Sequence, residues 1–315
     1  MIDKLIGNTP MIKIKYKYKG IERNVYSKLE YYNYTGSIKD RIVLNIIKKA
    51  KEDKLLLDNQ SIVEVSSGNT GVSLAAIGAL YKHPVHIFIP KSASIERINL
   101  MKLYGANIHV LDLNYVELLE EAKRFSKKIN GFMPNQFTNL NNSLTHYNET
   151  ALEIISKMKD IKISGFVSGI GTGGTLMGIG LKLKEFDSNI KLIALEPDSM
   201  PLLSLGKKIN THRIEGIGDD FIPDLVNKEL IDEIISINDI DAIMMSRKLS
   251  NTFGLGVGIS SGANFLASVL SNRNNIVTVF ADDSKKYLST DLLNFDIKNT
   301  HSKVNDIELI SIEVI

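Results

Sequence analysis

The 315-residue chain contains no cysteine, no tryptophan and no long hydrophobic run. Without cysteine there is no disulfide, no thiolate zinc site and no cysteine nucleophile. Because no stretch of ~18 apolar residues exists, no membrane-spanning helix is expected. The start, MIDKLIGNTP, lacks the apolar core of a secretion signal, which predicts a cytoplasmic protein. The six histidines are scattered along the chain, so no metal site is predicted.

An excess of charge of one sign is also missing. The 38 lysines and arginines nearly balance 36 aspartates and glutamates, which leaves a net charge of +2. No basic stripe for nucleic acid is therefore expected. The hydrophobic content of 43% and the length suit one large or two medium globular domains with a real core.

Short β-branched runs alternate with helical patterns along most of the chain. Strands are predicted at 61–65, 85–89, 107–111, 163–167, 191–196 and 276–280, with helices from about 70 and 94 and over 116–128. This alternation predicts parallel sheet with helices on both faces. The final residues, 310–315, form one more apolar, strand-like segment. A sheet this long is expected to split into two lobes with a cleft between them.

A glycine-rich loop, SGIGTGGTLMG at 168–178, follows one predicted strand and opens a helix. It contains the GxGxxG pattern at Gly169, Gly171 and Gly174, and Glu196 ends the next strand about 20 residues later. This is the dinucleotide pattern with its ribose carboxylate, so an NAD-dependent oxidoreductase is one hypothesis. Glycine N–H groups at a helix start also bind other phosphates, and a purely structural turn is the third interpretation.

A second loop, EVSSGNTGVSLA at 64–75, also lies between a predicted strand and a helix. The polar groups of Ser66, Ser67, Asn69 and Thr70 surround one concavity. Because no cationic side chain is among them, the concavity suits a carboxylate ligand. The alternative is an N-cap with ordinary turn residues. A third loop, GIGDDFIP at 216–223, carries two aspartates between glycines and an aromatic residue, and an exposed turn is the alternative there.

The stretch YTGSIKDRIV at 34–43 places Lys39 in the first turn of a predicted helix. Apolar residues recur at helical spacing from Ile38 onward, which makes Ser37 the expected N-cap. The helix dipole disfavours an ammonium group at that end, so Lys39 makes sense if its amine must be neutral to react. A phosphate loop, a carboxylate cradle and a neutral lysine together predict a Schiff base with pyridoxal phosphate.

Seven stretches occur in the same order along nearly the whole chain as in one enzyme family. They are LIGNTPMIKI (5–14), KLEYYNYTGSIKDR (28–41), SSGNTG (66–71), MPNQF (133–137), GTGGT (171–175), GISSGA (258–263) and YLST (287–290). With them the sequence resembles the cysteine synthases (O-acetylserine sulfhydrylases), the cystathionine beta-synthases and related β-replacement enzymes of PLP fold type II.

The resemblance implies a fold. It is the α/β tryptophan synthase beta-like fold, with two doubly wound domains of mainly parallel sheet and helices on both faces. The larger, PLP-binding domain is expected at 1–37 and 140–315, and the smaller, mobile substrate domain at 38–139. The family is usually homodimeric, although nothing in the sequence independently shows a dimer face.

The resemblance also implies roles for single residues. Lys39 would hold pyridoxal 5'-phosphate and later move the substrate α-proton, and Asn69 would bond the pyridine 3' oxygen. The cofactor phosphate would be held by Gly171, Thr172, Gly173, Gly174 and Thr175, so the GxGxxG match would be coincidental. The substrate α-carboxylate would be held by Ser66, Ser67, Thr70 and Gln136, and Asn69 would lie beside it.

Two positions depart from the family pattern. A gapless alignment of ADDSKKYLS (281–289) puts Asp283 where the family has a serine against the pyridine nitrogen. A carboxylate there would keep the nitrogen protonated, and a one-residue shift would put Ser284 there instead. Asp220 stands where the family usually has glycine, beside the leaving group. Its carboxylate could activate water, a thiol or an amine.

These roles predict PLP-dependent β-replacement on small amino acids derived from serine or cysteine, through an aminoacrylate. The default reaction is cysteine synthesis from O-acetylserine and sulfide, with release of acetate. The alternative is an L-cysteine lyase that releases hydrogen sulfide and adds water or a second thiol, with Asp220 as base. A diaminopropionate-type synthase and the NAD-dependent oxidoreductase are weaker alternatives.

Overall fold

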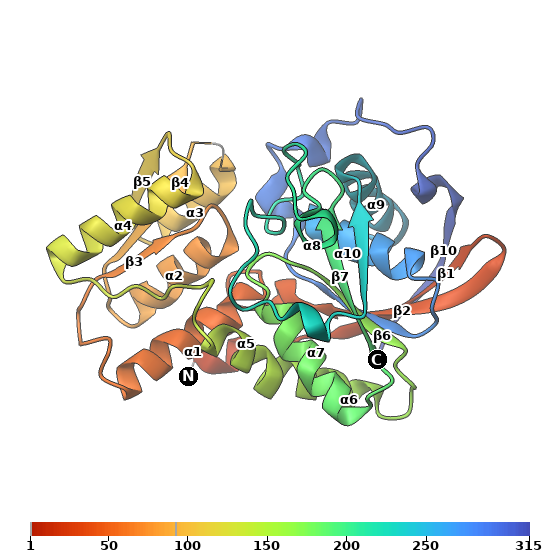
Figure 1. Cartoon of the computed structure of the whole chain (residues 1–315), viewed down its shortest axis with the longest axis horizontal. Coiled ribbons are helices and arrows are strands. Elements are labelled where there is room, and N and C mark those ends of the chain that lie inside the picture. The colour runs from red at the N-terminus through yellow and green to blue at the C-terminus, as the bar shows by residue number, and fades with distance from the viewer. Residues whose placement is uncertain (1, 92) are drawn as a thin grey trace.

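The structure is a computed structural model that describes residues 2–91 and 93–315, and it contains two separate β-sheets. Figure 1 shows the seven-stranded sheet on the right and the three-stranded sheet on the left, each with helices packed around it. We call these two halves the larger and the smaller lobe. The prediction of an α/β fold with parallel sheets flanked by helices is confirmed.

The larger sheet has the strand order β10-β1-β2-β9-β6-β7-β8. The strands from β2 to β8 in this order are parallel, whereas β1 is antiparallel to both β2 and β10. Parallel strands bring their carboxyl ends to one edge, where ligand sites of α/β folds form. The bounds are β1 Met11–Tyr18, β2 Ile21–Leu29, β6 Gly165–Gly169, β7 Lys191–Pro197, β8 Glu233–Ile237, β9 Ile276–Phe280 and β10 Ile307–Val314.

The antiparallel edge of this sheet is the part that the sequence analysis does not foresee. In β1, half-buried lysines alternate with buried apolar residues, which is the period of a strand with one face on the core. The final strand, β10, pairs with β1 from Ile12 opposite Val314 to Tyr18 opposite Ile307. The apolar end of the chain therefore adds to the sheet of its own lobe.

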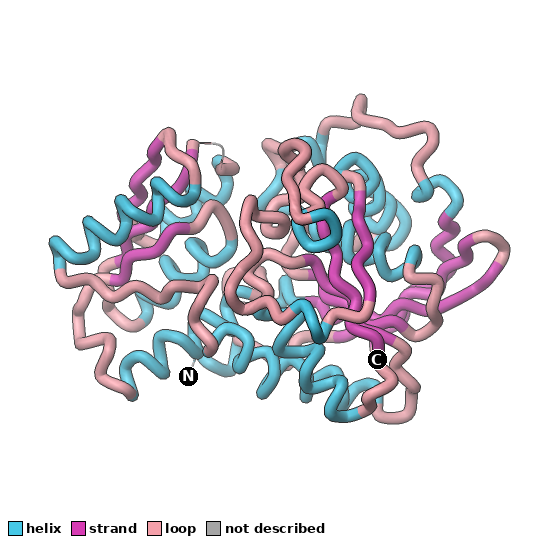
Figure 2. Tube along the Cα trace, viewed as in Figure 1, coloured by secondary structure: helices cyan, strands magenta, loops and turns pink. Residues whose placement is uncertain are grey.

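The smaller sheet is parallel throughout, with β3 Ile62–Val65, β4 Val85–Pro90 and β5 Asn107–Leu111. Strands β3 and β4 are buried on both faces, because Ile62 and Ile87 pack in one apolar cluster and Val63 and Phe88 pack in another. Strand β5 is half-buried or exposed along its length. The helices of this lobe are α2 Asn69–Leu80, α3 Ile95–Leu103 and α4 Tyr115–Ile129. Figure 2 shows how loops join them to the larger lobe.

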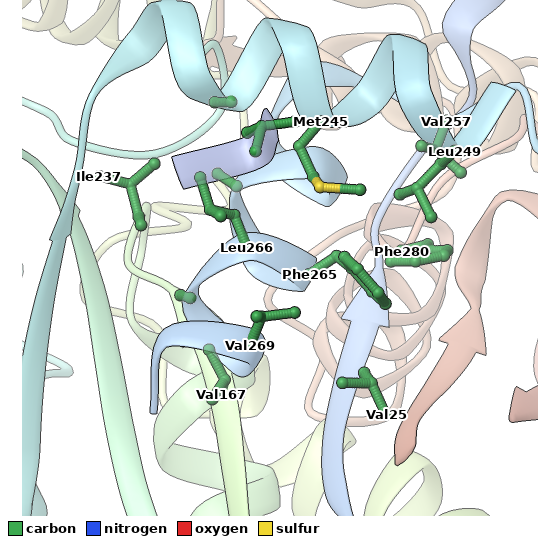
Figure 3. Packing of buried hydrophobic residues seen from close by; sticks show 14 of the residues in the cluster. Val25, Val167, Ile237, Met245, Leu249, Val257, Phe265, Leu266, Val269 and Phe280 are labelled. Atoms are coloured by element: carbon green, nitrogen blue, oxygen red, sulfur yellow. The ribbon is translucent and has the colours of Figure 1, made fainter. Parts of the chain in front are cut away.

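The remaining helices fall into two groups. Helices α1, α5, α6 and α7 lie along the lower side of Figure 1, and α8, α9 and α10 lie in the upper part of the larger lobe. Figure 3 shows the core under α10, where Phe265 and Phe280 pack beside Met245 and Leu249 of α9. The bounds are α1 Lys39–Glu52, α5 Asn141–Thr145, α6 Ala151–Met158, α7 Gly174–Phe186, α8 Leu202–Leu205, α9 Asp239–Phe253 and α10 Ile259–Leu270, with a π-helix, η3 His146–Thr150, between α5 and α6.

Most predicted element boundaries agree with the structure within two residues. The strands at 107–111 and 276–280 match, and the one expected at 163–167 lies at 165–169. The expected N-cap was wrong by one residue, because α1 begins at Lys39 with Ile38 as its N-cap. The Ser37 hydroxyl still accepts a hydrogen bond from the Lys39 N–H at 3.3 Å. Within residues 2–91 and 93–315, no helix has the length and apolar character needed to cross a bilayer.

Candidate functional site

Lys39 is the first residue of α1 and is half-buried. Burial lowers the pKa of its amine, and this effect exceeds that of the Asp219 and Asp282 carboxylates, which raise the pKa. The positive end of the α1 dipole also disfavours the charged amine. The lysine therefore has the environment that the sequence analysis expects of a reactive amine.

The loop before α7 has the geometry of an anion cradle. The N–H groups in the first turn of a helix lack intrahelical partners and lie at its positive end. Close approach requires glycine here, because a Cβ on Gly171 would lie 2.4 Å from the carbonyl oxygen of Gly216. A Cβ on Gly174 would lie 1.9 Å from Oδ1 of Asn142. Gly173 has a φ of +85°, which side chains rarely adopt.

Two threonines of this loop are held from the α5 side. Thr172 Oγ1 accepts a hydrogen bond from Nδ2 of Asn142 at 2.9 Å. Thr175 Oγ1 lies 3.2 Å from Nε2 of His146, a buried residue of the π-helix. Burial, together with nearby cations that include Lys39, lowers the His146 pKa to about 3. His146 therefore lies near both Lys39 and the cradle. The sequence did not point to His146, because a single histidine outside any spaced motif does not mark a site.

The loop between β3 and α2 meets the MPNQF segment. Thr70 Oγ1 donates to Gln136 Oε1 at 2.7 Å, and both side chains are buried. Gln136 Nε2 donates to a backbone carbonyl of β3 at 3.2 Å, which leaves its second N–H for a ligand. Ser66 Oγ accepts from the N–H of Gly71 at 3.0 Å, and Ser67 is exposed. Four of the predicted carboxylate-binding residues thus lie on two adjoining segments.

A buried carboxyl supports this part of the site. Glu64 in β3 accepts hydrogen bonds from the N–H groups of Val65 at 2.9 Å and Gln136 at 3.3 Å. Burial raises the Glu64 pKa to about 7, although these backbone bonds act against the rise. Glu64 was not among the predicted site residues, because nothing in the sequence marks a strand carboxylate as buried.

Asn69, at the start of α2, reaches across to the larger lobe. Its Nδ2 donates to Oδ2 of Asp282 at 2.7 Å, and its Oδ1 accepts from Nζ of Lys286 at 2.9 Å. Neither Asp282 nor Lys286 was predicted as a site residue, although both lie in the stretch 281–289 that the sequence analysis aligned.

The third loop brings Asp219 towards Lys39 and leaves Asp220 exposed. Burial raises the Asp219 pKa to about 6, and the Asp220 charge adds to the rise. The Lys39 charge acts in the opposite direction. Beside them, the Phe221 ring lies 5.2 Å from Tyr115 and 5.1 Å from Phe137, which come from the smaller-lobe side. A carboxylate pair and an aromatic cluster therefore lie at this end of the site.

The stretch after β9 gives Asp283 a local role. Its Oδ1 accepts from the Lys285 N–H at 2.9 Å, and it caps the 3-10 turn Ser284–Tyr287. Its Oδ2 lies 3.3 Å from the place that a Cβ on Gly36 would take. The choice between Asp283 and Ser284 as partner of a pyridine nitrogen stays a prediction.

The glycine pattern of a dinucleotide site lacks its acidic partner. Glu196 is buried, and it accepts hydrogen bonds from the Leu203 N–H at 2.8 Å and from the Ser204 hydroxyl. It therefore caps α8 and is not free for a ribose. The engagement of Glu196 argues against the NAD interpretation.

The groups brought together fit pyridoxal phosphate. The cradle has glycine N–H groups and threonine hydroxyls without any acid, which suits a phosphate. The half-buried Lys39 lies near it, since both neighbour His146. Asp282 interacts with the charge of Lys39 and also accepts a hydrogen bond from the Asn69 carboxamide. Residues 2–91 and 93–315 contain no group of three metal-ligating side chains.

Comparison with known sequences gives consistent results. The profile of the family described as "PALP: Pyridoxal-phosphate dependent enzyme" matches residues 2–282. "Cysteine synthase B" of Campylobacter jejuni is 42% identical over 298 residues, which span 92% of this chain and 97% of that protein. "Cysteine synthase" of Staphylococcus aureus is 37% identical over 303 residues, which span 94% of this chain and 97% of that protein.

Solved structures are equally similar. The hydrogen sulfide-producing enzyme of Fusobacterium nucleatum is 46% identical with a TM-score of 0.95, and the match covers 100% of this chain and 97% of that one. An aspartate-to-asparagine mutant of that enzyme, in complex with an α-aminoacrylate intermediate, has a TM-score of 0.96.

Proposed function

We propose a reaction for this chain from the premise that it belongs to the pyridoxal-phosphate-dependent enzyme family. The reaction is β-replacement on L-cysteine, in which water takes the place of the thiol and the products are L-serine and hydrogen sulfide. The observation that carries this choice is the Asp219–Asp220 turn beside Lys39. Cysteine synthesis needs no carboxylate there, whereas activation of water does.

Pyridoxal phosphate, when bound, supplies an electron sink that stabilises a substrate after loss of its Cα proton. The protein would hold it with the 171–175 loop, Lys39 and Asn69. Thr70 and Gln136 would hold the substrate α-carboxylate, with Ser66 and Ser67 beside them. That grip orients the Cα–H bond so that the Lys39 amine can remove its proton.

The replacement step balances without any further reactant. The C–S bond breaks, and the sulfur leaves as hydrosulfide with the bonding electron pair. Asp220 then takes a proton from water as the water oxygen bonds to the β-carbon, and that proton passes to the hydrosulfide. Lys39 returns to Cα the proton that it removed, which completes L-serine. Asp219 interacts with the charges of both Asp220 and Lys39, and its pKa is raised to about 6. Above that pH it is ionised and adds negative charge at this end of the site. Such a charge disfavours an anionic nucleophile and favours neutral water.

Cysteine synthase is the second candidate, and the relatives in Campylobacter and Staphylococcus favour it. In that reaction O-acetylserine loses acetate, and sulfide adds to give L-cysteine. The binding residues would have the same roles, and Asp220 would have none. The two candidates therefore differ in the role of one side chain.

The deciding experiment measures sulfide and serine formed from L-cysteine alone by the holoenzyme. We expect one serine for each sulfide in the wild type. Asp220→Asn should lower the rate by about 100-fold or more, which is the usual contribution of a general base. The absorbance of the bound cofactor should not change in that variant.

Two variants serve as controls. Asp219→Asn tests the neighbouring carboxylate and should lower the rate less than Asp220→Asn does. Lys39→Ala should abolish the covalent cofactor absorbance altogether. If wild-type protein with bound cofactor releases no sulfide from L-cysteine but makes L-cysteine from O-acetylserine, the lyase proposal is wrong and the second candidate stands.

Two broader features are also proposals. The family resemblance supports a homodimer, and the cytoplasmic location expected from the sequence stays a prediction. Sedimentation of the holoenzyme would test the first, and cell fractionation would test the second.

A further inference from the structure

Both ends of the Asn69 side chain are bound by residues that follow β9 in the larger lobe. The Nδ2 atom donates to Asp282 Oδ2 at 2.7 Å, and the Oδ1 atom accepts from Lys286 Nζ at 2.9 Å. Asn69 itself belongs to α2 of the smaller lobe. The amide therefore bridges the two lobes beside Lys39.

The chemistry of these partners allows a single orientation of the amide. An ammonium group only donates, so the atom facing Lys286 has to be the oxygen. An ionised carboxylate only accepts, so the atom facing Asp282 has to be the nitrogen. A flipped amide would place oxygen against oxygen and N–H against N–H. One of the two Nδ2 hydrogens is used by Asp282, and the other is left for a ligand.

Both partners are themselves held in place. Lys286 is buried, and its Nζ also donates to the Gly36 carbonyl at 3.0 Å. Asp282 is fully buried, and its Oδ2 accepts from the Tyr287 hydroxyl at 2.7 Å. Nη2 of Arg97 lies 3.6 Å from the same oxygen, and its guanidinium lies 4.5 Å from the centre of the Tyr287 ring. The cluster is therefore rigid enough to impose one amide orientation.

We propose that Lys286 and Asp282 are positioning residues that fix the Asn69 carboxamide with its second N–H directed at the ring oxygen of the cofactor. The inference deepens the proposed function, and it rests on the part that puts pyridoxal phosphate beside Asn69. Neither residue touches the cofactor; each acts through Asn69. The Asp282 charge is also felt at Lys39.

The physical consequence is a bias in the state of the ring oxygen. An N–H donor stabilises the ionised oxygen, whereas an amide oxygen in the same place would repel it. A hydrogen bond to a charged group shifts such an equilibrium by about 10- to 100-fold. The ionised and protonated states absorb at different wavelengths, so the bias can be read without any substrate.

The experiment compares absorbance spectra of purified holoenzymes and their rates of cofactor loss on dilution. In Lys286→Met we expect the ratio of ionised to protonated ring oxygen to fall about 10-fold or more, with faster cofactor loss. Lys286→Arg keeps a cationic donor and should restore most of the wild-type ratio. Lys285→Met removes an exposed neighbouring lysine and should leave the spectrum unchanged.

A double-mutant cycle with Asn69→Ala separates positioning from general support. If Lys286 acts through Asn69, Lys286→Met adds no further spectral change once the amide is gone. The inference would be overturned if Lys286→Met changed the spectrum equally in wild-type protein and in Asn69→Ala. An unchanged spectrum in Lys286→Met alone would overturn it too. If Lys286→Met does not fold, the same cycle is run with Asp282→Ala, which removes the acceptor of the Asn69 Nδ2 hydrogen bond and for which the expectations are the same.

The two proposals fail separately. Wild-type holoenzyme with normal absorbance that releases no sulfide would refute the proposed lyase reaction and leave the spectral cycle intact as a test. Sulfide release in the wild type together with additive spectral changes would refute the positioning role alone.

Discussion

At the scale of single residues, burial sets the charge state of the groups around Lys39. It lowers the pKa of Lys39 itself, lowers that of His146 to about 3 and raises that of Asp219 to about 6. All three groups are shifted towards their neutral forms, as expected where water is excluded. Such shifts are typical of sites that handle protons. They support a reactive amine at Lys39 more strongly than its position in a motif does.

Glu64 provides a test of this burial through stability. Its pKa is raised from 4.5 to about 7 in the folded protein, so the folded state favours the neutral carboxyl. Ionising the buried carboxyl lowers the free energy of unfolding. This loss of stability is absent below the unfolded pKa, grows as the pH rises between the two pKa values and is complete above the folded pKa. Glu64→Gln stays neutral at every pH. It should therefore match the wild type near pH 4 and be more stable by about 3 kcal/mol near pH 8.

Urea unfolding of both proteins at the two pH values measures this difference. Glu120→Gln, on the exposed face of α4, is the control and should show no pH-dependent difference from the wild type. Equal stability of Glu64→Gln and wild type at both pH values would contradict a neutral, buried Glu64.

The sequence predicted the candidate-site residues that lie in motifs. It did not predict the residues that contact them from distant parts of the chain. Asn69 was predicted, whereas its partners Asp282 and Lys286 lie 213 and 217 positions further along the chain. No local pattern can reveal a hydrogen bond over such a separation. His146 was missed for the same reason, because its partner Thr175 belongs to another helix.

At the scale of elements, periodicity predicted the parallel part of the fold well. Strands such as β5 and β9 are short apolar runs between helical patterns, and their bounds match the prediction. The β1–β2 hairpin was missed, although its lysine alternation has the period of a strand. The N-cap of α1 was misplaced because Ile38 already has helical backbone angles, which residue type alone does not show. Elements set by local periodicity were therefore predictable, and those set by tertiary pairing were not.

The packing of α7 against α5 allows a prediction at this scale. A Cβ on Gly178 would lie 2.1 Å from the backbone carbonyl oxygen of Ser143 and 2.9 Å from Cβ of His146. A backbone atom cannot move aside as a flexible side chain can, so α7 has to shift. Gly178→Ala should destabilise the protein by about 1–3 kcal/mol or more. Because α7 begins at the cradle, the variant should also lose its cofactor faster.

Thermal unfolding and cofactor release measure the two effects. Gly254→Ala is the control, because Gly254 has a φ of +69° but no atom within 4 Å of the added Cβ. It should cost about 1 kcal/mol through backbone strain, with no change in cofactor release. Normal cofactor retention in Gly178→Ala would show that the start of α7 does not depend on this contact.

At the scale of the whole molecule, α3 of the smaller lobe docks on the segment after β9. Ser94 Oγ donates to the Lys286 carbonyl at 3.2 Å, and Arg97 forms an ion pair with Glu215. Glu96 accepts two hydrogen bonds from Ser289, at 2.6 Å from the backbone N–H and 2.7 Å from the hydroxyl. These contacts cross the site from one lobe to the other. If residues 38–139 form the mobile substrate domain that the sequence predicts, these contacts hold the two lobes in a closed arrangement.

The Glu96 contact is the one to remove, because Glu96 lies outside the cradle and the substrate loop. Glu96→Ala loses two hydrogen bonds, each worth about 1 kcal/mol, so the closed arrangement should open roughly 30-fold more often. Amide exchange measured on the holoenzyme should speed up in α3 and at Ser289 but not in β6 or β9, which lie in the core of the larger lobe. Glu120→Ala, on the outer face of α4, should leave exchange unchanged. If exchange instead speeds up throughout both lobes, Glu96 supports global stability and the lobes do not move as separate bodies.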